Sequence, residues 1–466
     1  MINLSAQKII EGKVVYKEKY ETLALEGANV YWQGTSEGTV TDQSGNFNIS
    51  LSDKTNKLII SFLGFKTDTL TVLSEKNIVH QLKEDQTTNL NEVSITERKK
   101  SSKLSFTANQ NIILVDANEL LKAACCNLSE SFETNPSIDV NFSDALSGTK
   151  QISMLGLKSP YILISEENIP MVRGASQAFG LTFTPGTWVE SIQVSKGVGS
   201  VVNGFESIAG QINTELKKPF QDDPLFINIF RSGNGRLELN THINQKISEK
   251  WSTGLLVHLN QRNKKVDNNF DEFLDVPIAN QVNLLNRFQY TDPLKGWVIF
   301  YNWRFLNDKK QTGQVLFDPN FDKGFAERWG SEIDTKRFDT AMKVGYVFPQ
   351  FPYKSLGIQA SYSQHDQDAY YGLRNYDINH RSFFSNILYN SIFNNTTNKF
   401  KSGLNYTIDI YDENIDSQNY LRTDRNFGVF FEWSHDDLEK LSWTAGIRLD
   451  VNNNIGTFVT PRLHLR

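Results

Sequence analysis

Residues 189–197 read Val-Glu-Ser-Ile-Gln-Val-Ser-Lys-Gly, and residues 208–213 read Ile-Ala-Gly-Gln-Ile-Asn, with Gly199, Ser200 and Gly204 between them. Both blocks contain β-branched residues, and glycines separate them, which is typical of two strands joined by tight turns. Because so few residues separate the blocks, no crossover helix fits between them. This stretch therefore predicts strands punctuated by glycine.

The segment Gly197-Val198-Gly199-Ser200 follows an apolar strand and could be mistaken for a phosphate-binding loop. Such a loop needs a following helix, whose N-terminal N–H groups meet the phosphates within a βαβ unit. The next apolar stretch, residues 208–216, is again strand-like. The sequence therefore argues against a nucleotide site here.

Working towards the N-terminus, two segments that begin like capped short helices, at Asp116 and Asn127, precede a series of short strands. The strands lie at residues 151–157, 160–164 and 168–170. From residue 107 to residue 217 this succession resembles the plug domain of TonB-dependent outer-membrane receptors, and the blocks 189–197 and 208–213 are its most specific part. The chain departs from that family at Leu155, where arginine is common, at Asn203, where an aromatic is common, and at Gln211, where glycine is common. The resemblance implies an α+β plug.

Working towards the C-terminus, residues 218–466 alternate with a period of two. In residues 442–451, for example, Trp443, Ile447 and Leu449 share one face while Arg448 and Asp450 share the other. We count about twelve such segments, many as long as a membrane-spanning strand. Aromatic residues near segment ends suit the two membrane interfaces. This region predicts part of an antiparallel transmembrane β-barrel.

The connections between these segments are expected to alternate in length, with a brief turn at residues 349–352 and long loops at 307–333 and 364–380. The resembled receptors close at about 22 strands. An open sheet would leave two unpaired edges in lipid. We therefore expect the chain to be a fragment truncated at its C-terminus.

Before the plug, residues 7–84 contain short strands separated by turn clusters such as Asp42-Gln43-Ser44-Gly45-Asn46. This order resembles the carboxypeptidase regulatory-like domain, a non-catalytic β-sandwich often found ahead of outer-membrane receptors. Residues 1–6 read like the remnant of a secretory signal peptide. The fold class is thus mainly β: an N-terminal β-sandwich, an α+β plug and part of a 22-stranded barrel.

Residues 85–106 form a polar linker by composition. Within it lies a short β-prone segment suited to strand addition on a partner's sheet edge. In the resembled receptors the segment that contacts TonB precedes the plug, which makes this segment the candidate; an ordinary linker is the alternative. Its residues are Glu92, Val93, Ser94, Ile95, Thr96 and Glu97.

The chain has 466 residues, 48 basic and 53 acidic, and a net charge of −5, so it offers no broad cationic face for nucleic acid. The two cysteines, Cys125 and Cys126, are adjacent. Soft thiolates suit copper(I) or zinc and could contact a metal substrate. The alternative is that both cysteines are small buried packing residues. The sequence contains no recognisable catalytic motif and its histidines lack ligand spacing, so we expect neither an enzyme nor a cofactor.

The resemblance implies a TonB-dependent receptor in the outer membrane, with its N-terminal domain in the periplasm, that takes up a scarce metal, metal chelate or similar nutrient. Its expected partners are the TonB complex, outer-membrane lipids and the small-molecule substrate. Two alternatives remain open. One is a SusC-like glycan importer with a lipoprotein lid, and the other is a surface adhesion or signalling protein that does not transport.

Overall fold

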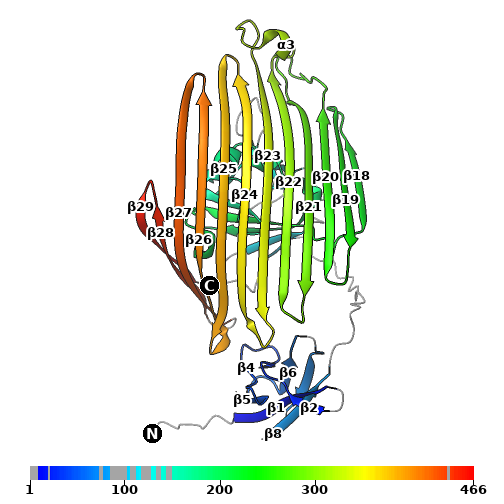
Figure 1. Ribbon diagram of the computed structural model, residues 1–466, viewed down its shortest axis with the longest axis vertical. Coiled ribbons are helices and arrows are strands. Elements are labelled where there is room, and N and C mark those ends of the chain that lie inside the picture. Colours follow the sequence, from blue (N-terminus) through cyan, green and yellow to red (C-terminus); the bar gives the residue numbers. More distant parts are fainter. Residues whose placement is uncertain are drawn as a thin grey trace.

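The computed structural model describes residues 9–18, 21–63, 65–72, 77–83, 102–104, 112–116, 127–132, 138–142, 150–437 and 441–465. Three bodies follow one another along the chain (Figure 1): an N-terminal sandwich, a plug region of smaller sheets, and a tall curved sheet, here called the barrel sheet. The predicted mainly β fold is confirmed.

The N-terminal sandwich consists of two four-stranded sheets. In the first, β1 (Ile9–Glu18) pairs with β2 (Glu21–Ala24), β5 (Asn46–Ser50) and β8 (Asn77–Leu82). The second has the order β4 (Gly38–Val40), β3 (Asn29–Trp32), β6 (Lys57–Ser61) and β7 (Asp68–Thr71). Inward-facing apolar residues of both sheets, including the fully buried Trp32, Leu58 and Ile60, form one core.

The plug region is built around a six-stranded mixed sheet. Its order is β15 (Ile169–Pro170), β14 (Ile162–Glu166), β17 (Gly210–Leu216), β16 (Val189–Lys196), β10 (Ile112–Asp116) and β9 (Ser102–Leu104). A second sheet holds β11 (Asp139–Phe142), β12 (Lys150–Met154) and β13 (Leu157–Lys158). The glycine-punctuated blocks 189–197 and 208–213 fall on β16 and β17, which pair antiparallel.

Short helical turns connect the plug strands. Asn127 caps α2 (Leu128–Ser131) by accepting a hydrogen bond from the Glu130 N–H, which confirms the helix start expected there. The helix expected from Asp116 falls on residues 117–122, outside the described residues. The 3-10 turns are η1 (Ser159–Tyr161), η2 (Gly174–Gln177), η3 (Gly180–Thr182), η4 (Gly186–Trp188) and η5 (Val201–Asn203).

The barrel sheet has twelve strands, each hydrogen-bonded antiparallel to the next in sequence. They are β18 (Leu225–Arg231), β19 (Arg236–Lys246), β20 (Trp251–Arg262), β21 (Ile278–Asp292), β22 (Trp297–Gly313), β23 (Gly330–Phe348), β24 (Phe351–Tyr371), β25 (Arg374–Phe393), β26 (Asn395–Ile415), β27 (Gln418–Asp436), β28 (Ser442–Asn452) and β29 (Gly456–Leu465). The plug region lies against the inner side of this sheet (Figure 1).

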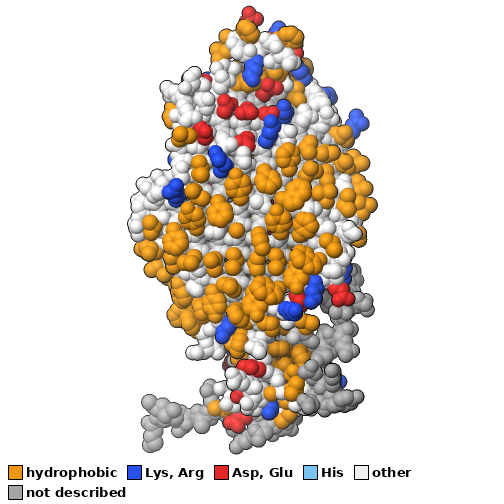
Figure 2. All heavy atoms as spheres, in the orientation of Figure 1, with side chains coloured by type: hydrophobic (Ala, Val, Ile, Leu, Met, Phe, Trp, Pro, Cys, Tyr) orange, Lys and Arg blue, Asp and Glu red, His pale blue; other side chains and the backbone are white. Residues whose placement is uncertain are grey.

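The two faces of the barrel sheet differ in polarity, as the period of two predicts. On β28, Ile447 and Leu449 are 54% and 44% exposed, whereas Arg448 and Asp450 between them are 1% and 0% exposed. The outer face carries a broad hydrophobic belt bordered by charged side chains (Figure 2). The apolar residues therefore point outward, and the buried polar ones point towards the plug region. Among the described residues no helix is both long and apolar enough to span a membrane.

Long connections are confined to one end of the barrel sheet. Strand β22 ends at Gly313 and β23 begins at Gly330, and the short helix α3 (Pro319–Asp322) lies between them. The long loop expected at residues 364–380 is wrong, because β24 continues to Tyr371 and β25 begins at Arg374. Polar residues there made the segment look like a loop. On these strands His365, Gln367 and His380 are buried on the inner face, and the acidic residues that alternate with them lie on the outer face near the strand ends.

The opposite end has brief turns and faces the N-terminal sandwich (Figure 1). Gly27 has φ +78°, and a Cβ at this position would lie 2.1 Å from the Gln350 carbonyl oxygen. Glycine therefore allows the sandwich to approach the turn between β23 and β24 closely.

Candidate functional site

The plug region contacts the barrel sheet through a tight turn between β14 and β15. Glu167 and Asn168 both have positive φ, 52° and 64°, as a two-residue hairpin turn requires. Asn168 adopts this conformation readily, and its N–H donates to Asn213 Oδ1 at 2.7 Å. A glutamate adopts this backbone conformation only at a cost in free energy, so contacts with neighbouring residues must stabilise it at Glu167.

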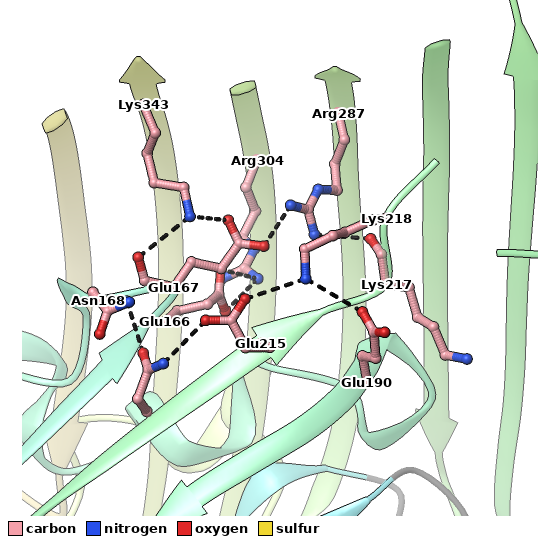
Figure 3. Close-up of polar contacts among 11 residues, drawn as sticks. Glu166, Glu167, Asn168, Glu190, Glu215, Lys217, Lys218, Arg287, Arg304 and Lys343 are labelled. Carbon is pink, nitrogen blue, oxygen red and sulfur yellow. Dashed lines mark hydrogen bonds and ion pairs between the residues drawn. The ribbon is translucent and has the colours of Figure 1, made fainter. Parts of the chain in front are cut away.

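Two cations from the barrel sheet hold the Glu167 carboxylate. Arg287 of β21 pairs with Oε1, and Lys343 of β23 lies 2.9 Å from Oε2 (Figure 3). Arg287 is fully buried and also donates to the Lys217 carbonyl at 2.9 Å. Burial opposes ionisation of Glu167, but Arg287 and Lys343 outweigh it and lower its pKa to about 2. Glu167 is therefore charged at neutral pH.

The neighbouring Glu166 makes a second contact with the same wall. Arg304 of β22 donates to both carboxylate oxygens, at 3.0 and 3.2 Å, and its guanidinium lies 5.4 Å from the centre of the Trp188 ring. Thr184 adds a hydrogen bond of 3.1 Å to Oε2. Both bonds come from one guanidinium nitrogen, Nη2, and they are charge-assisted, which makes them stronger than hydrogen bonds between neutral groups. We call Glu166 and Glu167 with Arg287, Arg304 and Lys343 the wall cluster.

Near the end with long connections, a second set of contacts, the Arg173 clasp, joins the plug region to β25, β26 and β27. Arg173 lies 2.7 Å from Asp409 Oδ2, and His380 lies 3.1 Å from Oδ1. The His380 ring stacks on Tyr411 with the ring centres 4.2 Å apart, and the Arg422 guanidinium also lies 4.2 Å from the centre of the Tyr411 ring.

Gly174 follows directly, with φ +56°. A Cβ there would lie 2.6 Å from the Tyr411 hydroxyl and 2.7 Å from His380 Cε1. The clasp therefore requires glycine at this position, both for its backbone conformation and for space.

A third set of contacts holds the segment that connects β16 and β17 against the barrel strands β27, β28 and β29. Arg462 donates to the carbonyls of Gly199, Ser200 and Phe205 at 2.7, 3.1 and 3.0 Å. The Ser200 hydroxyl donates to Glu432 at 2.5 Å. The backbone of this glycine-rich segment thus finds partners on the barrel sheet that the plug region alone does not supply.

Beside these contacts lies a cavity of about 650 Å³. The plug side contributes Gln193 and Asn213, and the barrel side contributes Lys343 and Glu432. A space of this size between plug and wall, with polar groups on both sides, can hold water next to the ion pairs.

The site residues predicted from the sequence are not among the residues of these plug contacts. Cys125, Cys126 and the segment from Glu92 to Glu97 lie outside the described residues. In the described part of the chain, no group of three or more His, Cys, Asp or Glu is arranged to hold a metal ion. Sequence reasoning missed the wall cluster. Its signal was the pair Glu166-Glu167 directly after the apolar run 162–164, together with Arg287 within an alternating strand.

Two family models match the chain. Residues 10–95 match the CarboxypepD_reg-like domain, and residues 105–211 match the TonB-dependent Receptor Plug Domain. The TonB-dependent receptor SusC of Bacteroides thetaiotaomicron is 32% identical over 104 residues, which are 22% of this chain and 10% of SusC. TonB-dependent receptor P3 of Formosa agariphila is 35% identical over 80 residues, 17% of this chain and 8% of the relative.

Solved structures agree in fold. FpvA of P. aeruginosa, in complex with a ferric pyoverdine, superposes with a TM-score of 0.62 at 12% identity over 77% of this chain and 54% of that one. The copper transporter OprC gives 0.59 at 12% identity over 78% and 59%. The chain thus spans little more than half of these structures and about a tenth of its curated relatives. Residues 105–211 therefore carry the plug domain of TonB-dependent receptors, and together these comparisons support a receptor of that kind in the bacterial outer membrane.

Proposed function

We propose that this chain forms part of a receptor for active uptake across the outer membrane, driven through TonB. The observation that carries the proposal is the chemistry of the plug contacts. The wall cluster, the Arg173 clasp and the Arg462 contacts consist mainly of ion pairs and hydrogen bonds. Three buried apolar clusters also join the plug region to the barrel sheet: Phe179 and Phe183 with Leu306, Ile333 and Ala369; Trp188 and Leu216 with Leu256 and Leu285; and Val201 and Val202 with Phe430. Water can replace the polar contacts, whereas separating an apolar interface would expose hydrophobic surface. Water could therefore take the place of the polar contacts when the plug shifts, whereas the three apolar clusters set the main resistance to that movement.

The proposal places the long-connection end outside the cell and the N-terminal sandwich in the periplasm. The segment from Glu92 to Glu97 is the proposed TonB contact, and outer-membrane lipids cover the hydrophobic belt (Figure 2). Pulling on that segment would act on the plug through β9 and β10, which continue the sheet of β16 and β17. The substrate is proposed to be a scarce nutrient such as a metal or metal chelate.

A second candidate is a glycan importer with a lipoprotein partner. The match to SusC, which extends over 104 residues, favours it. Recovery of a lipoprotein with the complete receptor in mild detergent would support this candidate, and absence of one would count against it. A receptor that only adheres or signals is the remaining alternative.

Deletion of residues 92–97 from the complete receptor tests the transport proposal. We expect the variant to reach the outer membrane and assemble, but to lose growth on the nutrient that the receptor serves and to lose capture of the TonB C-terminal domain. Deletion of residues 85–90 is the matched control, because it shortens the linker equally and leaves the proposed contact intact. Full growth after deletion of 92–97 would refute TonB-driven uptake and favour adhesion or signalling.

A further inference from the structure

The chain passes from the plug region to the barrel sheet through residues 217–224, here called the connecting segment. The Lys218 carbonyl accepts hydrogen bonds from the N–H groups of Gln221 and Asp222, both at 2.9 Å, so the segment folds into a tight turn. The Lys217 carbonyl accepts a further bond from the buried Arg287 of β21. The connecting segment is therefore held both by its own backbone and by the barrel sheet.

Asp222 fastens this turn to β19. His242 Nδ1 lies 2.9 Å from Asp222 Oδ2, and Asn244 Nδ2 donates to the same oxygen at 3.0 Å. Asn244 also donates to two backbone carbonyls of the connecting segment, from Nδ2 to Asp223 at 2.7 Å and from its N–H to Pro224 at 2.9 Å. The side chains of Asp222 and His242 are only 6% and 1% exposed. Separating the segment from β19 would leave these buried polar groups unpaired, which is costly.

Apolar packing surrounds the connecting segment on the same side. Trp188 and Leu216 of the plug region pack against Leu256 of β20 and Leu285 of β21, and all four side chains are buried. Movement of the plug at this point would therefore expose hydrophobic surface as well as unpair Asp222. The side of the plug that faces β19 to β21 is thus fastened by packing, by buried hydrogen bonds and by the chain itself.

Strands β25 to β28 lie at the other side of the barrel sheet from β19 (Figure 1). The 650 Å³ cavity is lined by strands β22 to β28, and a further cavity of about 230 Å³ lies between the plug region and β25 to β28. The polar contacts on this side are the Arg173 clasp, which holds the plug tip at residues 173–177, and the bonds of Arg462 and Ser200. Free volume beside these contacts lets water enter as they break.

Strands β16 and β17 link the two sides. The start of β16 pairs with Leu216, within the apolar cluster, and its end pairs with Gly210, beside the segment that Arg462 holds. At about 3.3 Å per residue, the eight residues of β16 span roughly 25 Å. Strand β10 begins at Ile112, which pairs with Ser195 near the end of β16. A pull that reaches β10 along the chain would therefore act on β16 far from the connecting segment.

We propose that the connecting segment is the hinge of the plug, and that β16 and β17 form a lever that swings away from β25 to β28 when the plug is pulled. The proposal rests on the uptake function above and adds a direction to it: the path opens along β22 to β28, while the contacts at β19 to β21 stay closed. A hinge at this point leaves the cluster of Trp188 and Leu216 intact. Of the three apolar clusters described, the two around Phe183 and Phe430 then have to separate.

Thiol labelling at two matched positions tests the hinge in cells that carry the complete receptor. Phe430→Cys and Leu285→Cys each place a thiol on the inner face of the barrel sheet, at residues that are both 2% exposed and packed against the plug. Cys125→Ser and Cys126→Ser remove the two cysteines of this chain. The probe is a small, membrane-impermeant methanethiosulfonate, and labelling is compared between cells with and without TonB. Because a buried thiol reacts only while its site is open, we expect labelling of Phe430→Cys to become about tenfold faster with TonB and labelling of Leu285→Cys to stay unchanged.

Three labelling results would overturn the hinge: an equal rise at both positions, a rise at Leu285→Cys alone, or no rise at either while growth still depends on residues 92–97. Val202→Cys and Leu216→Cys lie on the plug side of the same two clusters, and they replace the barrel pair if a barrel variant does not assemble.

Hydrogen exchange of the purified complete receptor gives a readout that does not depend on TonB. The amides of residues 197–204, at the far end of the lever, should exchange about tenfold faster than those of residues 217–222, after correction for intrinsic rates. Equal rates or the reverse order would contradict the hinge. Failure of the uptake function is a separate result, because it appears as unchanged growth after deletion of residues 92–97 and leaves this order of exchange as it is.

Discussion

Replacing Glu167 by glutamine removes the charge at the centre of the wall cluster while keeping the size of the side chain. Arg287, which is fully buried, and Lys343 then face a neutral amide. Leaving a buried charge without its partner typically costs about 3–5 kcal/mol. Lys343 also lines the 650 Å³ cavity, where water can solvate it, so the cost arises mainly at Arg287 and should fall near the lower end of that range.

The expected result is looser seating of the plug on an intact barrel. Hydrogen exchange of the β14–β17 amides, measured by mass spectrometry on the complete receptor, should accelerate by roughly a hundredfold, as about 3 kcal/mol implies. Glu190→Gln is the matched control. Glu190 is partly exposed and its partner Lys218 also pairs with Glu215, so the expected change is below about 1 kcal/mol. Equal exchange in Glu167→Gln and Glu190→Gln would refute the reasoning.

Acid should have the same effect on the unmodified receptor. Because the folded-state pKa of Glu167 is lowered from 4.5 to about 2, its contribution is fully present above pH 4.5 and is lost as the pH falls towards 2. Exchange in β14–β17, corrected for the intrinsic pH dependence, should therefore rise across that window in the unmodified receptor. In Glu167→Gln the rise should be smaller, because the titrating group is absent. A rise of the same size in both proteins would show that other groups dominate.

Three further perturbations test the remaining contacts. Gly174→Ala places a methyl group against Tyr411 and His380 and should expose the plug tip to limited proteolysis. Gly156→Ala is the control, because Gly156 also has positive φ but has open space around it, and this variant should be cleaved far less. Equal cleavage of the two variants would contradict the packing argument. Arg462→Met leaves the carbonyls of Gly199, Ser200 and Phe205 without their hydrogen-bond donor. The loss should lower the stability of the segment around η5 by about 1–3 kcal/mol and speed its hydrogen exchange. Unchanged exchange would mean that water replaces the guanidinium. If Cys125 and Cys126 contact a metal substrate, the Cys125→Ser, Cys126→Ser double variant should lose copper uptake by the complete receptor, and unchanged uptake would exclude that role.

Much of the architecture was predictable because strand periodicity is a local property. Alternation within residues 442–451 is enough to separate the outward Ile447 from the inward Arg448, because successive side chains on a strand point to opposite faces. The capping residue Asn127 and the turn at Asp42 act over three or four positions. The loop expected at residues 364–380 failed for a related reason. Inside a barrel, inward residues are polar, so a strand end there and a solvated loop have similar compositions.

The seating of the plug, by contrast, depends on pairs that the sequence keeps far apart. Glu166 and Arg304 are 138 residues apart, and Arg173 and Asp409 are 236 apart. Alternation tells which face of a strand a charge occupies, but not which charge of another domain it meets. That choice follows from the curvature of the barrel sheet and from the docking of β14–β15 against it. Sequence alone was therefore sufficient for the family resemblance and the strands, because both depend on local patterns of residues. The tertiary structure alone brought together the residues of the wall cluster and of the Arg173 clasp.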